Sequence, residues 1–498
     1  MPEESNIHPT IERTMDFSDK FSPMLVKELR QGLKGTSFII LFIALQAILA
    51  LLIVGQSFAV SYDSIGDSIS SAIFICLGLA TCVIQPLRGI SAVGGEIKEN
   101  TIDLMVITRL SAWKIVYGKW ISLVSQSALI IVAVSPYLIL RYFFGGMQLF
   151  GELMILLSMF IASAGFTALF IGISSFPSLI LRGILGLACS VFIGMSVFGL
   201  FIDSRIYQDL LELMTFQFSE AIGVYALLVL FTAYIGWLAL DFGAGYIAPI
   251  SENRSTARRL ITLGIVAILY VVFFFSDTDF KQAAPAFMII LSIPIAIISL
   301  TELPYTTATV SVPFVKKGFF GRLSSFLFYP GWASGLNFVL LLFLLSIFSC
   351  FFYEPLRHYN ENYFKIMLTI VAASFSCLLF PLLIVRIFFK KTANIFVFYL
   401  ASAIGLFILW MLISIIVEQT RSQELYKPIF WIPPIQFNML GRSLNRETAA
   451  LVAIPVFMFY WVSCFLTSRT AWKHVRENDL KARGIIESEK QFQTEEQT

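Results

Sequence analysis

The sequence has little charge and few of the residues on which metal or redox chemistry depends. Of its 498 residues, 13% are Asp, Glu, Lys or Arg, which is about half the share found in soluble domains. The three histidines are far apart, and the six cysteines lie inside apolar runs without a CxxC or Cys/His cluster. These absences argue against a metal centre, a disulfide framework and nucleophilic chemistry built on His or Cys.

The sequence also lacks the short motifs of common enzymes. It contains no GxxxxGK[ST], so it has no phosphate-binding loop of its own. It contains no GxSxG, no HExxH and no paired-carboxylate motif. We therefore expect no enzymatic activity and no cofactor in this chain, and no nucleic-acid partner.

What the sequence does contain is apolar residues, at 57% of the chain, with 15% aromatic. A chain with this many apolar residues cannot cover its surface with polar groups in water. The composition therefore predicts an all-α polytopic membrane protein in contact with membrane lipids. Runs of about 20 apolar residues predict twelve transmembrane helices. We place them near 36–58, 67–87, 119–140, 153–175, 179–202, 220–247, 259–276, 284–301, 333–352, 366–385, 394–417 and 448–467.

The distribution of positive charge predicts the orientation of these helices. With the N-terminus in the cytoplasm, the cytoplasmic segments hold 26 of the 35 Lys and Arg residues. The positive-inside rule therefore favours a multi-pass protein of the cell (inner or plasma) membrane with both termini in the cytoplasm.

The segment 22–35, SPMLVKELRQGLKG, differs from the polar tail before it. Ser22 is a helix-capping residue, and Pro23 suits the first helical position. Apolar side chains fall on one face and charged ones elsewhere, which predicts an amphipathic helix lying on the membrane surface. The apolar positions are Met24, Leu25, Leu29 and Leu33, and the charged ones are Lys27, Glu28, Arg30 and Lys34.

The stretch 88–119 is the longest charged segment between apolar spans in the first half, yet it holds the apolar run 102–107. Asn100 or Thr101 can cap a helix there, with Asp103 completing a capping box after Asn100. Ile102, Met105 and Val106 then form an apolar stripe. This short helix either fits a groove on a soluble partner or packs back on the bilayer surface.

The same stretch resembles the signature of ABC-2 type transporter permeases. That family has an acidic turn, Gly-Thr, an acidic residue, a hydrophobic triplet, Thr-Pro-Leu-Ser and then Gly-Lys at the third span. Here Asn100 stands for the usual Gly and Arg109 for the usual Pro. Segment 22–35 is similar to the family's elbow helix at Pro23, Lys27, Glu28 and Arg30. The matching residues of the signature are Glu96, Thr101, Asp103, Leu104, Met105, Val106, Thr108, Leu110, Ser111, Ile115, Val116, Gly118 and Lys119.

The resemblance implies a permease subunit whose ATP is bound and hydrolysed by a separate ABC-type ATPase subunit. That subunit docks on a coupling helix near 97–108, through Glu96, Thr101, Asp103, Leu104, Met105 and Val106. The transport path lies between the two halves of this chain, or two permease chains dimerise through their first halves. The sequence does not indicate which substrate is transported.

The predicted organisation has four parts. A flexible cytoplasmic tail, 1–21, precedes an ABC-2 type unit of six spans, 22–250. A second six-span region, 251–467, is a candidate diverged half. The tail 468–498 is charged, and we expect it to begin as a helix and end disordered.

Two other functions remain open. A secondary transporter needs ionisable groups within the membrane, and apart from the terminal residues of the predicted spans only Arg182 and Asp241 fall inside them. A membrane-embedded lipid or glycan enzyme needs convergent charged groups, which the loop 418–447 holds. For the glutamines of the first spans, we expect hydrogen bonds to neighbouring helices rather than a place along the transport path. They are Gln46, Gln56, Gln85 and Gln126.

Overall fold

The protein is all-helical throughout the part of the chain that the computed structural model describes, and no strand occurs in that part. Eleven of these helices are long and apolar enough to cross a membrane. A twelfth is added if two consecutive helices, bent by 50°, count as one span. The described residues are 23–57, 65–95, 111–142, 148–176, 178–217, 221–249, 252–275, 281–303, 307–351, 361–389, 395–420, 429, 431–440 and 443–495.

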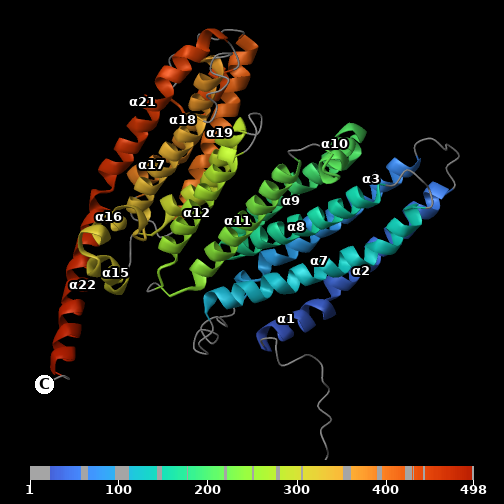
Figure 1. Cartoon of the computed structure of the whole chain (residues 1–498), viewed down its shortest axis with the longest axis horizontal. Helices are drawn as coiled ribbons and strands as arrows, with labels where there is room; N and C mark the ends of the chain where they lie inside the picture. Colours follow the sequence, from blue (N-terminus) through green and yellow to red (C-terminus); the bar gives the residue numbers. More distant parts are fainter. Residues whose placement is uncertain are drawn as a thin grey trace, which may run out of the picture. The chain divides into compact units, whose positions relative to one another are not determined.

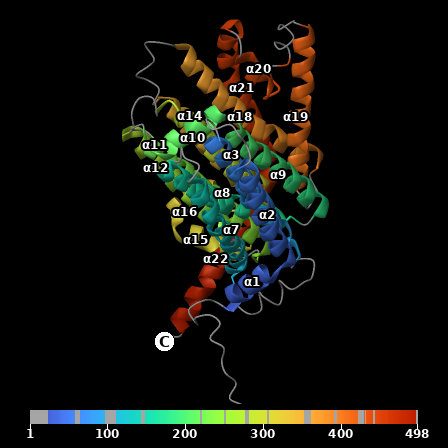
Figure 2. The ribbon, with the colours of Figure 1, turned by 90° about the vertical axis from the view of Figure 1, so that its right-hand side faces the viewer.

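The chain divides into two compact units, residues 1–247 and 248–498. In the first unit an amphipathic helix, α1, lies at the ends of α2 and α7 (Figures 1 and 2). The elements of this unit are α1 (Pro23–Lys34), α2 (Thr36–Ser57), α3 (Ile65–Gly78), η1 (Leu79–Ile84), α4 (Gln85–Leu87), η2 (Arg88–Ser91), α7 (Ala112–Tyr142), α8 (Leu149–Ser174), α9 (Leu179–Ile202), α10 (Ser204–Met214) and α11 (Ala221–Ile247).

Small residues bring α8 and α11 close together. A Cβ at Gly165 would lie 2.5 Å from Cγ2 of Thr232, and one at Gly172 would lie 2.7 Å from the carbonyl oxygen of Ala239. Membrane helices cannot gain from apolar burial in lipid as they do in water, so close backbone approach is what drives their association. The α8–α11 pair is therefore a closely packed part of the first unit.

The second unit contains five long apolar helices, two short helices before α17, and a last span that continues into a charged helix. Its elements are α12 (Arg254–Phe275), α14 (Ala284–Thr301), α15 (Ala308–Lys316), α16 (Gly318–Phe328), α17 (Trp332–Ser349), α18 (Glu361–Phe388), α19 (Ile395–Thr420), α20 (Ile435–Leu440), α21 (Ser443–Thr467) and α22 (Arg469–Glu495).

A buried ion pair fixes the start of α17. The guanidinium of Arg259, with a fully buried side chain, lies 2.7 Å from Oε2 of Glu302. It also donates to the carbonyl oxygens of Tyr329 and Gly331, at 2.9 and 3.1 Å. The N–H of Gly331, whose φ is 126°, donates to the same Glu302 oxygen at 3.0 Å. The charge is thus compensated, and α12, the end of α14 and the α16–α17 turn are tied together.

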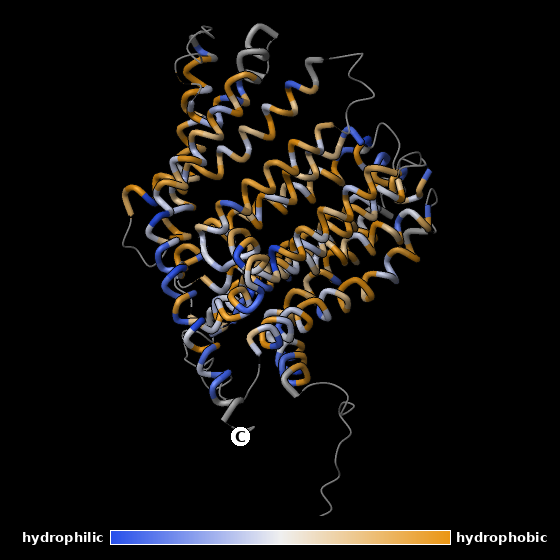
Figure 3. The backbone as a smooth tube through the Cα atoms, turned by 60° about the vertical axis from the view of Figure 1, so that its left-hand side comes forward, coloured by the Kyte–Doolittle hydropathy of each residue, from blue (hydrophilic) through white to orange (hydrophobic). Residues whose placement is uncertain are grey.

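The C-terminal tail is more ordered than its composition predicted. We expected disorder towards its end, but α22 continues as one helix to Glu495. Ala471, Val475 and Ala482 are buried along one side of it, and α15 packs against this helix. Figure 3 shows the contrast in hydropathy, with apolar colouring along the spans and polar colouring along α22. Packing supplies the stability that a charged helix lacks on its own.

The twelve predicted spans correspond to eleven apolar helices and the bent α21–α22 pair of the structure, and they differ at some ends. The predictions 179–202 and 284–301 coincide with the apolar spans observed there. The third span begins at Ala112, seven residues before the predicted start, because Lys114 and Lys119 lie within α7. Hydropathy alone placed Lys114 outside the span and Lys119 at its first residue, and the reason why Lys119 is tolerated within α7 lies in its contacts.

Candidate functional site

The site that the structure builds most fully is the junction of α1, α4 and α7 in the first unit. Leu25, Leu29 and Leu33 are half-buried on one face of α1, as its periodicity predicts. The carboxylate of Glu28 lies 3.3 Å from the ammonium of Lys119 on α7. The backbone carbonyl of Glu28 also accepts a hydrogen bond of 2.9 Å from Ser122 Oγ. Two polar contacts from one residue thus fix α1 against α7.

The predicted elbow residues therefore have different surroundings. Pro23 is the first residue of α1, and Glu28 is the residue that pairs with α7. The side chains of Lys27 and Arg30 are exposed. Lys119 is almost buried, with 9% of its side chain accessible, so its charge depends on Glu28.

A second polar cluster lies beside this ion pair. It consists of Gln85 on α4, Arg88 on η2 and Gln126 on α7. Gln85 Nε2 donates to the carbonyl of Leu123 at 3.2 Å and to Oε1 of Gln126 at 3.0 Å. Arg88 Nη1 donates to Gln85 Oε1 at 2.9 Å and to Gln126 Oε1. Gln85 and Gln126 are fully buried. These bonds favour one arrangement of the helices, because a displacement would break them and leave further buried polar groups unsatisfied, as Gln126 Nε2 already is.

The helix α1 packs onto this cluster through a glycine. A Cβ at Gly32 would overlap Nε2 of Gln126 and would lie 3.0 Å from Ser122 Oγ. Arg88 also lies 5.8 Å from the ring centroid of Phe38, at the start of α2. The α1–α2 corner and the α4–α7 contact are therefore one packed structure, which we call the α1 junction: Glu28, Gly32, Gln85, Arg88, Lys119, Ser122 and Gln126.

The helix that carries Arg88 is irregular. Its middle, η1, is a π-helix in which the N–H of Gln85 bonds to the carbonyl of Ala80, five residues back, and its end, η2, is a 3-10 helix. Pro86 has no N–H to donate, and the carbonyl of Thr81 accepts instead from Ser163 Oγ at 2.6 Å. Changes of helix type within one span mark positions where it bends readily.

Beyond η2 the chain is held by α8 and α9. The N–H of Val93 donates to Ser174 Oγ at 3.2 Å. A Cβ at Gly94 would overlap the guanidinium of Arg182, which itself donates to the carbonyl of Ser174 at 3.4 Å. Arg182 thus ties the start of α9 to the end of α8.

The predicted docking residues lie outside the described residues. Glu96, Thr101, Asp103, Leu104, Met105 and Val106 all fall within 96–110. The structure describes the chain up to Gly95 and again from Ser111. It therefore shows how both attachments of this segment are held, at Val93 and Gly94 on one side and at α7 on the other. The charged side chains of the 418–447 loop lie outside the described residues as well.

Sequence reasoning found part of the polar interior and missed the rest. Cross-helix bonding of Gln85 and Gln126 is confirmed, and Gln46 Nε2 donates to the carbonyl of Ala133 at 3.4 Å. Buried Glu152, which accepts from Ser70 Oγ at 3.3 Å, was missed. The ion pair of Arg259 and Glu302 was also missed, although both flank spans at the same predicted side, a signal that would have found it.

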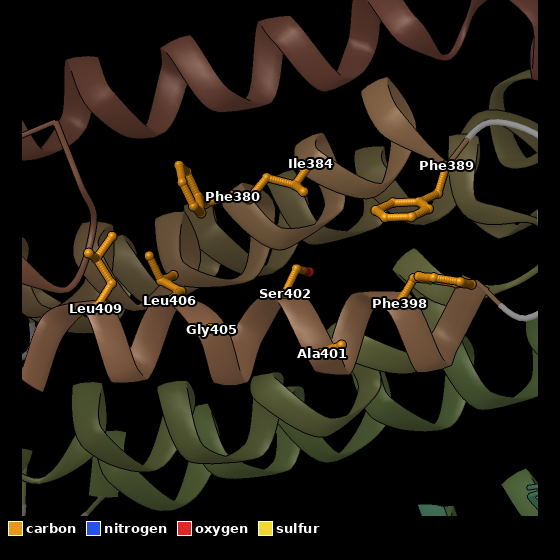
Figure 4. A pocket seen from close by; sticks show the side chains of 9 residues that line it. All are labelled: Phe380, Ile384, Phe389, Phe398, Ala401, Ser402, Gly405, Leu406 and Leu409. Atoms are coloured by element: carbon orange, nitrogen blue, oxygen red, sulfur yellow. The ribbon is translucent and has the colours of Figure 1, made fainter.

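Each unit has an apolar cavity among its described residues. The first, about 300 Å³, lies between α7, α8 and α11 and is lined by Trp113, Tyr117, Trp120 and Trp237. The second, about 430 Å³, lies between α18 and α19, whose side chains face one another across it (Figure 4). Stacked Phe389 and Phe398, with ring centroids 4.4 Å apart, bound the second. Both cavities suit apolar groups, and no metal-binding cluster occurs among the described residues.

No family model, curated protein or solved structure matches this chain. The geometry above therefore carries the functional argument. What it describes is a polytopic membrane protein in which an amphipathic helix is locked to the base of two spans.

Proposed function

We propose that this chain is the transmembrane permease subunit of an ABC-2 type transporter, an exporter driven by a separate ATPase subunit that docks on the 88–119 segment. The observation that carries the proposal is the α1 junction. An elbow-like helix, the end of one span and the start of the next are locked together by Glu28–Lys119 and by Gln85, Arg88 and Gln126.

The contacts around this junction suggest how a force is passed on. A force on residues 96–110 acts at one end through Val93 and Gly94 on the α8–α9 corner. At the other end it acts on α7, which carries α1 with it through Lys119. In this mechanism the span would bend in its irregular part, from η1 to η2. Closure of two ATPase subunits would in this way move the spans of the first unit as a group.

The distribution of charge supports the orientation that this mechanism needs. Most Lys and Arg residues fall on the side of the α1 junction when both termini are cytoplasmic. The ATPase, which binds cytoplasmic ATP, then meets the 88–119 segment. In a cell (inner or plasma) membrane the direction of transport would be export, as the resemblance implies.

Capture of the ATPase tests the proposal. The tagged full-length protein is purified in mild detergent from its own cells, and the ATPase activity and identity of co-purifying proteins are measured. Met105→Asp puts a charge on the predicted docking stripe and should remove the ATPase, whereas the matched variant Met105→Leu should retain it. An absent ATPase, or equal capture by both variants, would contradict the proposal.

A secondary transporter is the second candidate, and buried carboxylates favour it. Glu152 and Asp241 are 1% and 7% exposed within apolar helices of the first unit. Coupling ions are commonly bound by such groups. If they couple transport to protons, Trp fluorescence of the purified protein should show a pH transition that Glu152→Gln or Asp241→Asn abolishes. A pH-independent signal together with ATPase capture would leave only the first candidate.

A further inference from the structure

The second unit contains a cavity that is lined by both charged and aromatic side chains. It measures about 910 Å³ and lies between α16 and the joint of α21 and α22. These elements lie together at the α22 end of the unit (Figure 1). Its volume is in the range of sites for small molecules.

The cavity is strongly basic on one side. Five cationic residues line it and one acidic residue, Asp479, does so. Four of the cations lie on α22 at spacings of three, four and seven residues, which places them on one face of that helix. The five are Arg322, Arg469, Lys473, Arg476 and Arg483.

These charges are largely uncompensated. Arg322 and Arg483 interact with Asp479. For Arg469, Lys473 and Arg476 no acidic partner is found in the described part of the chain. All five of these side chains are exposed to solvent, which screens their mutual repulsion, and their concentration around one cavity attracts anions. The cluster therefore predicts an anionic ligand.

The other side of the cavity is aromatic. Phe326 of α16 stacks on Trp472 of α22, with ring centroids 5.7 Å apart and planes 18° from parallel, and Phe465 of α21 completes this wall. The indole N–H of Trp472 is buried and has no acceptor among the described residues. Buried indole N–H groups usually have a partner. This unsatisfied donor is a second, independent indication of a ligand.

The position of the cavity relates it to the edge of a membrane. The apolar part of α21 ends at Thr467, and the charged helix α22 begins at Arg469, bent by 50°. Beside it α16 exposes three large apolar side chains, Phe319 and Phe320 at 77% and Leu323 at 60%. Such a helix lies in the headgroup region with these side chains in the acyl chains. The cavity is thus at the level of lipid headgroups.

We propose that this cavity binds an anionic phospholipid, with its phosphate among Arg469, Lys473 and Arg476 and its acyl chain along Phe326 and Phe465. Basic pockets beside membrane helices recognise phosphorylated headgroups in this way. The aromatic wall favours a lipid over a free phosphate or an acidic peptide, neither of which uses it. The proposal is independent of the ATPase-driven function.

Binding of defined lipids tests it. The full-length protein is delipidated in detergent and titrated with phosphatidylglycerol or phosphatidylcholine, and bound lipid is counted by native mass spectrometry. Arg469→Gln/Arg476→Gln should weaken phosphatidylglycerol binding by about ten-fold. The control Lys481→Gln/Lys490→Gln removes the same charge from α22 outside the cavity and should change it less than about two-fold.

The acyl chain is tested separately with phosphatidylglycerol brominated on its chains. It should quench a part of the Trp fluorescence that Trp472→Phe removes, and this readout does not require a charge substitution. Equal weakening in both double variants would show a diffuse charge effect and overturn the proposal. Displacement of the lipid by millimolar inorganic phosphate would assign the site to free anions, and displacement by a co-purified ATPase would assign it to a protein partner; either result overturns the proposal.

Discussion

Glu28 of α1 and Lys119 of α7, 91 positions apart in the sequence, hold the amphipathic helix against the start of a span. Their charged atoms are 3.3 Å apart, and their side chains are 16% and 9% exposed. In this largely buried setting the two opposite charges compensate each other. The first predictions follow from this contact.

Removing one partner should destabilise the first unit. Glu28→Gln keeps the shape of the side chain but leaves the Lys119 ammonium buried without its carboxylate. We expect a loss of about 1–3 kcal/mol, since the pair is partly reached by solvent. Thermal unfolding in detergent measures it. Lys119→Met in the same chain should recover part of the loss, and additive losses in the double variant would show that the two residues do not act as a pair.

The packing of α1 at Gly32 should be sensitive to the size of the side chain at this position. In Gly32→Ala the new methyl group overlaps the Gln126 amide, so we expect a loss of about 1–3 kcal/mol in thermal unfolding. The control is Gly55→Ala on α2, where a Cβ meets nothing within 4 Å. That change should be neutral or slightly stabilising. Equal melting of the two variants would mean that α1 is not packed on the Gln126 cluster.

The buried ion pair of the second unit predicts a larger effect. Arg259→Met removes a fully buried cation that bonds to Glu302 and to backbone carbonyls around Gly331. We expect a loss of about 3–5 kcal/mol, seen as a collapse of the monodisperse peak in size-exclusion chromatography. Lys316→Met, whose ion pair with Glu489 has side chains that are 51% and 53% exposed, is the control and should cost less than about 1 kcal/mol. A monodisperse, stable Arg259→Met protein would contradict this role.

Asp479 predicts a dependence on pH. Burial raises the pKa of its carboxyl above the ordinary value, against the lowering effects of Ser311 on α15, Arg322 on α16 and Arg483 on α22. A raised pKa in the folded state means that the stability of the protonated form is present below the unfolded pKa and is lost as pH rises through the folded value.

Asp479→Asn, which mimics the protonated form, should therefore melt at or above the wild-type temperature at pH 7.5. The difference should shrink as pH falls towards the ordinary aspartate range, near 4. The same variant should bind phosphatidylglycerol more tightly, by about three- to ten-fold, since one opposing charge is gone. Melting curves across pH and the lipid titration check both, and a lower melting temperature at pH 7.5 would contradict the first.

The fold class and most span positions were predictable because the bilayer acts on each segment separately. A helix that crosses lipid must be apolar over its length, whatever its neighbours are, so the runs 179–202 and 284–301 could be located without knowing their contacts. The amphipathic face of α1 could be predicted for the same reason, because it is a local periodicity of Leu25, Leu29 and Leu33.

Tertiary structure decided where the charges inside the apolar helices find their partners. Nothing local in the sequence pairs Glu28 with Lys119 or Arg259 with Glu302, which lie 91 and 43 positions apart. Nor does a local pattern predict that the carbonyl of Thr81 accepts a hydrogen bond from Ser163, or that the cations of α22 line one cavity together with Phe326. Burial of a charge is favourable only when the whole chain brings its partner to it, and that is a property of packing, not of any one segment.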